Sequence, residues 1–414
     1  MIQDHVKDIP VLRSYRGLVP VLLIIIITVI VHFRKKTVLL EKWTQFLNYL
    51  LLIYCVVDIV TILMGINVED HSYANKLTGS VNSSLVKLRP NVYFLLFDEY
   101  PGYKSLRDSF GFKNEVFYKK LSDDSFTIIP TFSNYSGTAF SMSSIFNMDY
   151  VNKKNLNETS PQRELQERGK EIENAAVFNV FSQLGYEIQS FSVFDVLDKK
   201  SIGGNSFILG HSRLLTDKMF HNRFIKDVAW QFINGNFSIP AFQQLYFGEI
   251  KTYNARAEEG LIASLDKKNN SPRFIYAHFL MPHQPYFFDS VGREQNIARL
   301  EDAAVLADKS LFLSYLQYAN KKIGAFADLI VQKDSSAIVI LLSDHGFRAY
   351  QSSKKYEPYK FDNFCAIRYT GSKPLPASLP ISNVNLFRYI FNECFYQHLP
   401  YLENKVSLLK EKDR

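Results

Sequence analysis

The chain has 414 residues, of which 47% are hydrophobic and 21% are charged, and these proportions exclude a disordered or fibrous protein. The formal net charge is +7, from 48 basic and 41 acidic residues. The basic residues form no long run, so we expect no nucleic-acid partner. Three cysteines are too few for a disulfide scaffold or a cysteine-rich zinc module.

Two apolar runs near the N-terminus predict a membrane anchor over residues 1–66. Residues 17–33 and 46–66 are each about as long as the hydrocarbon core of a bilayer requires, and we interpret them as two transmembrane helices. The first run also has the length of a signal-peptide core. The residues between the runs carry four basic side chains: Arg34, Lys35, Lys36 and Lys42. The positive-inside rule therefore places this loop in the cytoplasm and the rest of the chain outside, with the lipid bilayer as a partner.

The rest of the chain divides into a polar linker (67–89), a globular domain (90–400) and a charged tail (401–414). Short continuous apolar runs predict buried strands, and apolar residues at helical spacing predict helices between them. The predicted strands are 92–97, 187–193, 274–280 and 337–342, and the predicted helices are 172–184 and 311–331. Strands that alternate with helices predict an α/β fold with a mostly parallel central sheet flanked by helices.

Polar residues follow three of the predicted strands. Asp98 and Glu99 come after the first, His283 follows the third, and Asp344 and His345 follow the last. The carboxyl ends of parallel strands meet at one edge of a sheet, so these side chains are expected to lie close together. Because strand side chains alternate, only one of the two acids after the first strand is expected to face this edge. Carboxylates and imidazoles are suitable ligands for a divalent cation.

Four segments together resemble the alkaline phosphatase/sulfatase superfamily, and above all its membrane-anchored branch of lipoteichoic acid synthases and phosphoethanolamine transferases. They are Pro90–Asp98, Asn134–Tyr150, Met281–Tyr286 and Leu342–Gly346. Their order and spacing are similar to those of the corresponding segments in the family, over roughly residues 90–400. The resemblance implies a sulfatase-like fold and a metal-dependent hydrolase or transferase.

The resemblance also implies roles for individual residues. Asp98, Asp344 and His345 match metal ligands, and Thr138 matches the nucleophile, which also contacts the metal. We expect one divalent ion, which could be Zn, Mn, Mg or Ca. Ser136 is the main rival of Thr138, because hydroxyl side chains crowd this segment. A helix that begins here could be capped by such hydroxyls or could bind an anionic ester.

Three further residues are candidates for substrate binding. His283 matches a family histidine that contacts the substrate or leaving group. His278 is a weaker candidate, because the period of two along a strand leaves open whether it shares a face with His283. Arg348 follows the Asp344-His345-Gly346 turn, where a guanidinium could bind a phosphate oxygen or simply lie at the surface.

One departure from the family narrows the chemistry. Classical sulfatases carry a Cys/Ser-x-Pro-x-Arg motif, whereas this chain reads Thr138-Ala139-Phe140-Ser141-Met142. A hydroxyl nucleophile favours phosphoryl chemistry. We therefore expect an enzyme of the bacterial inner membrane that transfers or hydrolyses a phosphate-linked group on a lipid or cell-envelope glycan at the outer, periplasmic side. A sulfate or phosphonate ester hydrolase, and a non-catalytic envelope protein of the same fold, remain as alternatives.

Overall fold

The computed structural model describes most of the predicted globular domain and one long N-terminal helix. The described residues are 24–25, 27–28, 31, 37–65, 81–151, 161–203, 240–267, 271–296, 300, 308–348, 359–371, 374–376 and 381–407. The chain divides into two compact units, Met1–His71 and Ser72–Arg414. Each unit is described by itself.

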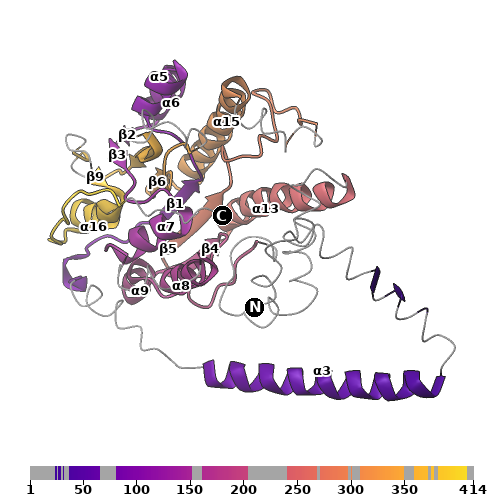
Figure 1. Cartoon of the computed structure of the whole chain (residues 1–414). Helices are drawn as coiled ribbons and strands as arrows, with labels where there is room; N and C mark the ends of the chain where they lie inside the picture. The colour runs from indigo at the N-terminus through magenta and orange to yellow at the C-terminus, as the bar shows by residue number, and fades with distance from the viewer. Residues whose placement is uncertain are drawn as a thin grey trace. The chain divides into compact units, whose positions relative to one another are not determined.

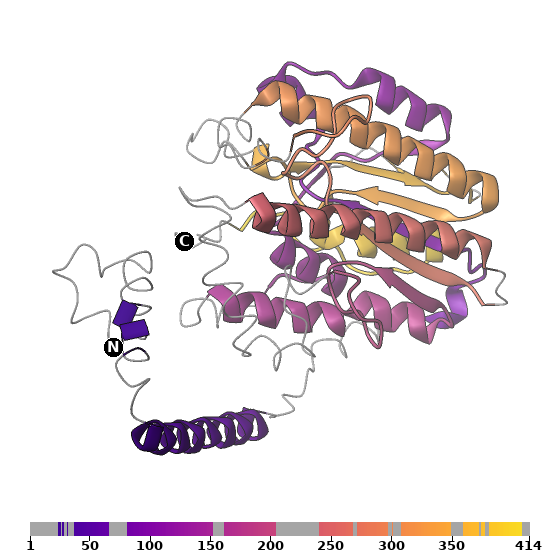
Figure 2. The ribbon, with the colours of Figure 1, turned by 90° about the vertical axis from the view of Figure 1, so that its right-hand side faces the viewer.

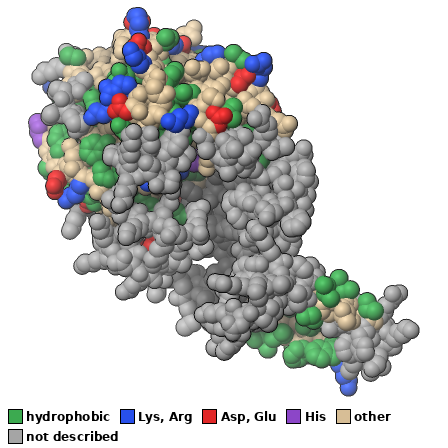
Figure 3. Space-filling model, turned by 45° about the horizontal axis from the view of Figure 1, so that its top comes forward, with side chains coloured by type: hydrophobic (Ala, Val, Ile, Leu, Met, Phe, Trp, Pro, Cys, Tyr) green, Lys and Arg blue, Asp and Glu red, His purple; other side chains and the backbone are tan. Residues whose placement is uncertain are grey.

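The first unit contains the helix α3 (Thr37–Gly65), which includes most of the second predicted membrane span. Large apolar side chains are exposed along it, among them Phe46, Leu51 and Ile53. Figure 3 shows hydrophobic side chains, in green, on the surface of the molecule. The first predicted span, 17–33, falls almost entirely outside the described residues. Among the helices of the described part of the chain, none combines the length and the apolar character needed to cross a bilayer. The two transmembrane helices therefore stay a prediction.

The second unit is built on a six-stranded sheet with the order β2-β8-β6-β1-β5-β4. The strands are β1 (Val92–Phe97), β2 (Phe126–Ile128), β4 (Glu187–Phe191), β5 (Arg273–Phe279), β6 (Ile338–Leu342) and β8 (Cys365–Arg368). Each predicted strand is present, with ends within about two residues of those expected. The prediction of an α/β fold is confirmed.

The sheet is mixed: parallel pairing predominates in it, as predicted, and β8 is the antiparallel exception. The strands β6, β1, β5 and β4 are parallel neighbours, but β8 pairs antiparallel with both β6 and β2. The described part of the connection from β6 to β8 contains only a short strand, β7 (Asp362–Asn363), and no crossover helix.

Helices cover both faces of the sheet (Figures 1 and 2). They are α5 (Tyr103–Phe110), α6 (Glu115–Asp123), α7 (Thr138–Asn147), α8 (Pro161–Glu173), α9 (Ala176–Gln183), α13 (Pro240–Asp266), α15 (Lys309–Lys333) and α16 (Leu386–Phe395). The predicted helix 311–331 lies inside α15. The predicted helix 172–184 is instead two helices, because Ala175 has an extended backbone (φ −66°, ψ 151°) that ends α8 and starts α9.

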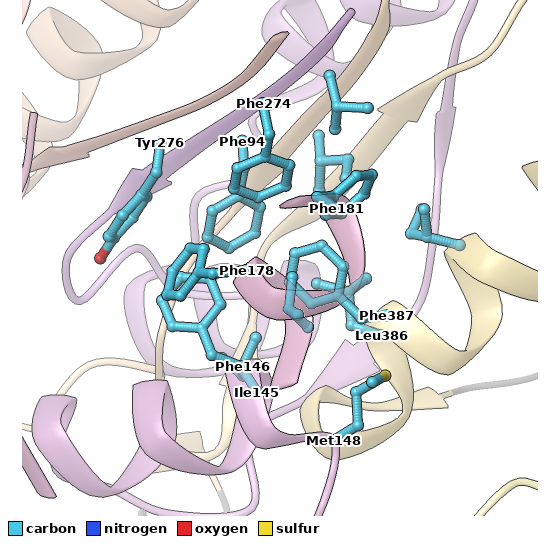
Figure 4. Close-up of a cluster of buried hydrophobic side chains, with 14 of the residues drawn as sticks. Phe94, Ile145, Phe146, Met148, Phe178, Phe181, Phe274, Tyr276, Leu386 and Phe387 are labelled. Atoms are coloured by element: carbon cyan, nitrogen blue, oxygen red, sulfur yellow. The ribbon is translucent and has the colours of Figure 1, made fainter. Parts of the chain in front are cut away.

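Two hydrophobic clusters hold these layers together. On one face, Phe94 of β1 packs with Phe146 of α7 and Phe387 of α16 (Figure 4). On the other face, Tyr93 and Leu95 of the same strand belong to a cluster with α6, α13 and α15. Successive side chains of a strand point to opposite faces, and here both faces are covered. This double burial explains why the strand reads as a continuous apolar run.

A second, three-stranded sheet lies at the end of the central sheet where β1 and β6 finish. It has the order β7-β3-β9, with β3 at Thr131–Phe132 and β9 at Ile381–Ser382. β3 leads into the loop before α7, and β9 leads into the short helix η7 (Asn383–Asn385) that precedes α16.

Candidate active site

The carboxyl ends of β1 and β6 bring three predicted metal ligands together. Leu96 pairs with Leu342 in the parallel ladder, so Asp98 and Asp344 follow at matching positions. One ligand atom from each of Asp98, Asp344 and His345 lies within 4.8 Å of the others, and all three residues are buried. Nε2 of His345 is 3.8 Å from Oδ1 of Asp98 and 3.1 Å from Oδ2 of Asp344.

Hydrogen bonds between the two strand ends fix this arrangement. The backbone N–H of Glu99 donates to Oδ1 of Asp344 at 3.1 Å, and that of Tyr100 donates to Oγ of Ser343 at 2.8 Å. The Ser343 hydroxyl in turn donates to the carbonyl of His345 at 2.7 Å. Backbone N–H groups after β1 therefore bond side chains in the turn after β6 and hold the two strand ends together.

The chemistry of these residues fits a divalent cation. Oδ1 of Asp98 and Oδ2 of Asp344 are buried, and neither has a hydrogen-bond partner in the described part of the chain. Unpaired buried carboxylate oxygens are costly, and coordination of a cation would satisfy them. Nδ1 of His345 lies 2.9 Å from the Gly346 carbonyl and donates to it, which leaves the lone pair of Nε2 for the cluster.

The electrostatics of the cluster agree with this fit. Burial and the nearby charge of Asp98 raise the pKa of Asp344 to about 6. Burial also acts to raise the pKa of Asp98, but the neighbouring His283 and His278 outweigh it and hold the pKa below its usual range. Burial and the charge of Arg348 lower the pKa of His345 to about 4, so this imidazole is neutral at pH 7. Two close carboxylates beside a neutral imidazole favour a bound cation.

Thr138 reaches this cluster from the first position of α7. Its Oγ1 lies 3.3 Å from Nε2 of His345. The preceding residue, Gly137, is the N-cap of the helix and has no side chain to bond the first-turn amides. Such amides, together with the helix dipole, favour an anionic group. Thr138, the expected nucleophile, therefore lies beside one of the expected metal ligands and at a helix N-terminus that favours an anion.

Three serine hydroxyls within α7 have hydrogen-bond partners of their own. Ser141 donates to the Asp344 carbonyl at 2.6 Å, Ser143 to a carboxylate oxygen of Glu171, and Ser144 to the Asp149 carbonyl at 2.8 Å. Each of these three serines is buried. They hold α7 in place, whereas the Thr138 hydroxyl contacts the histidine of the cluster.

Glu99 also faces the site, which corrects the expectation that only one of the two adjacent acids does so. Its backbone is left-handed (φ +63°), and this turn interrupts the strand alternation just after Asp98. The Glu99 carboxylate is buried, and its Oε1 accepts a hydrogen bond from the N–H of Arg348 at 2.6 Å. Its Oε2 lies 3.4 Å from Nε2 of His283.

The predicted substrate residues His283 and Arg348 contact each other. Nη2 of Arg348 lies 3.1 Å from Nε2 of His283, and Nη1 donates to the Ser136 carbonyl at 3.2 Å. Nδ1 of His283 donates to the Gln284 carbonyl at 2.5 Å. The pair therefore stands beside the loop that presents Thr138.

His278 lies behind Asp98. Its side chain is fully buried, with Nε2 3.8 Å from Oδ2 of Asp98. On its other side, Nδ1 is 3.1 Å from the Tyr276 hydroxyl. These contacts favour a role for His278 in orienting Asp98 over direct contact with a substrate.

Comparison with known proteins gives one family. The family model for sulfatases matches residues 107–370, a range that contains Thr138, His283, Asp344 and His345 and begins after Asp98. No curated protein sequence matches the chain.

Similar folds occur among solved structures at 11–12% identity. A Bacteroides thetaiotaomicron protein from a study of glycosaminoglycan metabolism has a TM-score of 0.48 (12% identity; 74% of this chain and 73% of that chain covered). The periplasmic domain of EptC from Escherichia coli in complex with Zn has a TM-score of 0.44 (11%; 72% and 80%). The lipoteichoic acid synthase LtaP from Listeria monocytogenes also has 0.44 (12%; 78% and 77%).

Proposed function

Because the chain belongs to the sulfatase family, we propose that it is a metal-dependent enzyme. Its proposed reaction is the transfer or hydrolysis of a phosphate-linked group on a lipid or cell-envelope glycan. The Thr138 hydroxyl is the nucleophile. The observation that carries the proposal is the 3.3 Å contact between this hydroxyl and His345, in the same cluster as the buried Asp98 and Asp344 carboxylates.

One divalent ion (Zn, Mn, Mg or Ca) would be held by Asp98, Asp344, His345 and Thr138, and when bound it would lower the pKa of the hydroxyl and offset the charge of the ester. The chain itself supplies the geometry. The first turn of α7 directs the Thr138 hydroxyl toward His345, where the imidazole is neutral and bonded to the Gly346 carbonyl.

In the proposed first step the Thr138 hydroxyl loses its proton to solvent, its Oγ1 forms a bond to phosphorus, and the bond between phosphorus and the leaving oxygen breaks. The leaving oxygen takes a proton from Nε2 of His283, which in this step is protonated beside Oε2 of Glu99, while the Arg348 guanidinium binds the substrate instead of this nitrogen. Arg348 and the α7 amides bind the non-bridging oxygens, because a guanidinium and a helix N-terminus both favour phosphate. Water or an acceptor hydroxyl then displaces Thr138 from phosphorus and releases the product.

A second candidate is a sulfate or phosphonate ester hydrolase, which the sulfatase family match favours. Against the sulfate reaction, the segment that begins at Thr138 lacks the Cys/Ser-x-Pro-x-Arg motif. A third candidate is a non-catalytic member of the family with a binding or structural role in the envelope.

We also propose that residues 1–66 attach the protein to a bacterial inner membrane and that the linker 67–89 holds a catalytic domain, residues 90–400, on the periplasmic side. The exposed apolar side chains of α3, such as Phe46 and Leu51, support attachment. Cell fractionation with protease treatment of spheroplasts tests this arrangement. Recovery of the full chain in the soluble fraction would contradict it.

The reaction is tested with the purified full chain and a panel of p-nitrophenyl esters: a phosphodiester, a phosphate monoester, a phosphonate and a sulfate. Elemental analysis precedes the assay, and each divalent metal is added back after chelation. We expect metal-dependent cleavage of the phosphodiester in preference to the sulfate. Preferred cleavage of the sulfate or phosphonate supports the second candidate, and a protein that binds no metal supports the third.

A further inference from the structure

The helix η7 (Asn383–Asn385) contacts both loops of the proposed active site. Nδ2 of Asn383 lies 3.3 Å from the carbonyl of Ser343 and 3.2 Å from that of Asp344. The next residue, Val384, donates its backbone N–H to Oδ1 of Asn134 at 2.7 Å. Asn134 opens the loop that ends at Thr138. One short element therefore links the loop of the nucleophile to the loop of the metal ligands.

The side-chain amide and the backbone carbonyl of Asn134 both have hydrogen-bond partners. Its side chain is buried, and Nδ2 donates to the Lys405 carbonyl at 2.7 Å and to the Tyr150 hydroxyl at 3.2 Å. Its own carbonyl accepts from the N–H of Ser407 at 2.8 Å. A buried amide is costly unless its hydrogen bonds are made, so this network specifies one position for the loop.

The chain that supplies the last of these partners runs from residue 399 to residue 407, and we name it the strap. Two asparagines hold it in the same way. Asn385 donates to the Leu402 carbonyl and accepts from its N–H, both at 2.8 Å. Asn392 does the same with Leu399, at 2.9 and 2.7 Å. We call each such pair of hydrogen bonds a bracket. The Asn385 bracket lies next to the hydrogen bonds of Asn134, whereas the Asn392 bracket lies on α16.

We propose that Asn134 and Asn383 are positioning residues, which together with the strap set the separation between the Thr138 hydroxyl and the carboxylate–imidazole cluster. This inference rests on the proposed function. The hydrophobic residues of α7, such as Met142 and Phe146, pack the body of the helix in a hydrophobic cluster. In the loop before the helix, Asn134 is hydrogen-bonded to Val384 and to the strap, and Asn383 bonds the Asp344 carbonyl in the facing loop.

The two asparagine brackets provide a matched test that needs no activity. Asn385→Ala removes the two bonds to Leu402 and a third bond to Oδ1 of Asn404, and so releases the strap next to Asn134. Asn392→Ala removes the corresponding pair of bonds to Leu399, which touches neither loop. Hydrogen exchange followed by mass spectrometry then reports on the peptide of residues 133–141. We expect at least tenfold faster exchange there in Asn385→Ala and no change in Asn392→Ala. Equal exchange in the two variants would overturn the proposal.

Kinetics with the phosphodiester give the second readout. In Asn134→Ala and Asn385→Ala we expect kcat to fall on the order of 10- to 100-fold, because displacements of about 1 Å are that costly to catalysis. KM should change less than about threefold, and Asn392→Ala should match the wild type. Asn134→Asp keeps the acceptor for the Val384 N–H but loses the donor to the Lys405 carbonyl. We therefore expect its kcat to lie between those of the wild type and Asn134→Ala.

A loss of activity that only follows the folded fraction, equal for Asn385→Ala and Asn392→Ala, would show that the network is merely structural and would overturn the proposal. Failure of the proposed function looks different. In that case the wild type cleaves none of the esters, while the exchange difference between the two bracket variants still decides whether the strap positions the loop.

Discussion

Oγ1 of Thr138 lies 3.3 Å from Nε2 of His345, although 207 positions separate the two residues in the sequence. The contact joins the first turn of α7 to the turn after β6, and it places a hydroxyl beside a neutral imidazole and two buried carboxylates. A threonine hydroxyl is a weak nucleophile by itself, so this environment is what makes it a candidate for catalysis.

The first prediction concerns this hydroxyl. Thr138→Ala should lower kcat by several powers of ten, as removal of other covalent nucleophiles does, and Thr138→Ser should keep part of the activity. Ser136→Ala is the matched control from the same loop and should remain active. Phosphodiester cleavage by the three purified variants checks the prediction. If Ser136→Ala is inactive and Thr138→Ala is not, Ser136 is the nucleophile.

The second prediction concerns the cation. Metal that binds the folded chain and not the unfolded chain should raise the melting temperature, since a ligand at 100 times its Kd stabilises by about 2.7 kcal/mol. Chelation should lower the melting temperature and abolish ester cleavage. Calorimetry with and without each metal measures the shift.

The shift should disappear in Asp98→Asn, which removes one ligand charge from the cluster. Asp328→Asn, at a surface carboxylate that pairs with Lys120, is a control that should keep it. A metal shift that survives in Asp98→Asn would place the cation elsewhere in the chain.

The third prediction concerns Arg348. Its guanidinium bonds the Ser136 carbonyl and contacts His283, so Arg348→Ala should raise KM and lower kcat for an anionic ester, together on the order of 100-fold in kcat/KM. Arg348→Lys should recover little, because an ammonium cannot reproduce the fork of the guanidinium. Arg107→Ala changes a surface arginine that pairs with Asp108 and should leave kcat/KM unchanged.

Unchanged kcat/KM in Arg348→Ala would remove this side chain from the substrate site. Melting curves of each arginine variant show whether a loss of activity arises from unfolding.

The fourth prediction concerns stability and pH. Burial raises the pKa of Asp362 to about 6, although its Oδ2 accepts a hydrogen bond from the N–H of Ser105 at 2.6 Å. A carboxyl whose pKa is higher in the folded state contributes most to stability below its unfolded pKa near 3.8, and the contribution is lost as the pH rises through 6. Asn in its place can accept the same bond without a charge.

Asp362→Asn should therefore be more stable than the wild type at pH 7, by on the order of 2 kcal/mol, and the difference should vanish near pH 4. Urea unfolding of both proteins across this range measures it. A difference that is constant with pH would show that the carboxyl of Asp362 titrates normally in the folded protein.

Sequence patterns predicted β1, β4, β5 and β6, but not β2 and β8, and predicted that Asp98, Asp344 and His345 lie together, because these features depend on short-range signals. A strand covered on two faces reads as an apolar run, and the residues after Phe97 and Leu342 are fixed at one edge by the parallel pairing of β1 and β6. Local signals were weaker where the backbone departs from a regular element. The left-handed turn at Glu99 and the extended residue Ala175 are such places.

Other features depend on contacts that no local pattern records. The antiparallel pairing of β8 with β6 is such a feature, and residue spacing did not indicate it. The bond between Val384 and Asn134 joins positions 250 apart, and isolated asparagines in polar segments are common. The sequence therefore identified the loop before Thr138 as a candidate, but not the residues that bond to it.

The bond between Ser407 and Asn134 also has a consequence for biosynthesis. The ribosome translates Thr138 long before the strap, which is hydrogen-bonded to its loop. The first half of the domain therefore leaves the ribosome before this contact can form. The loop before Thr138 can take its final position only after residue 407 has left the exit tunnel.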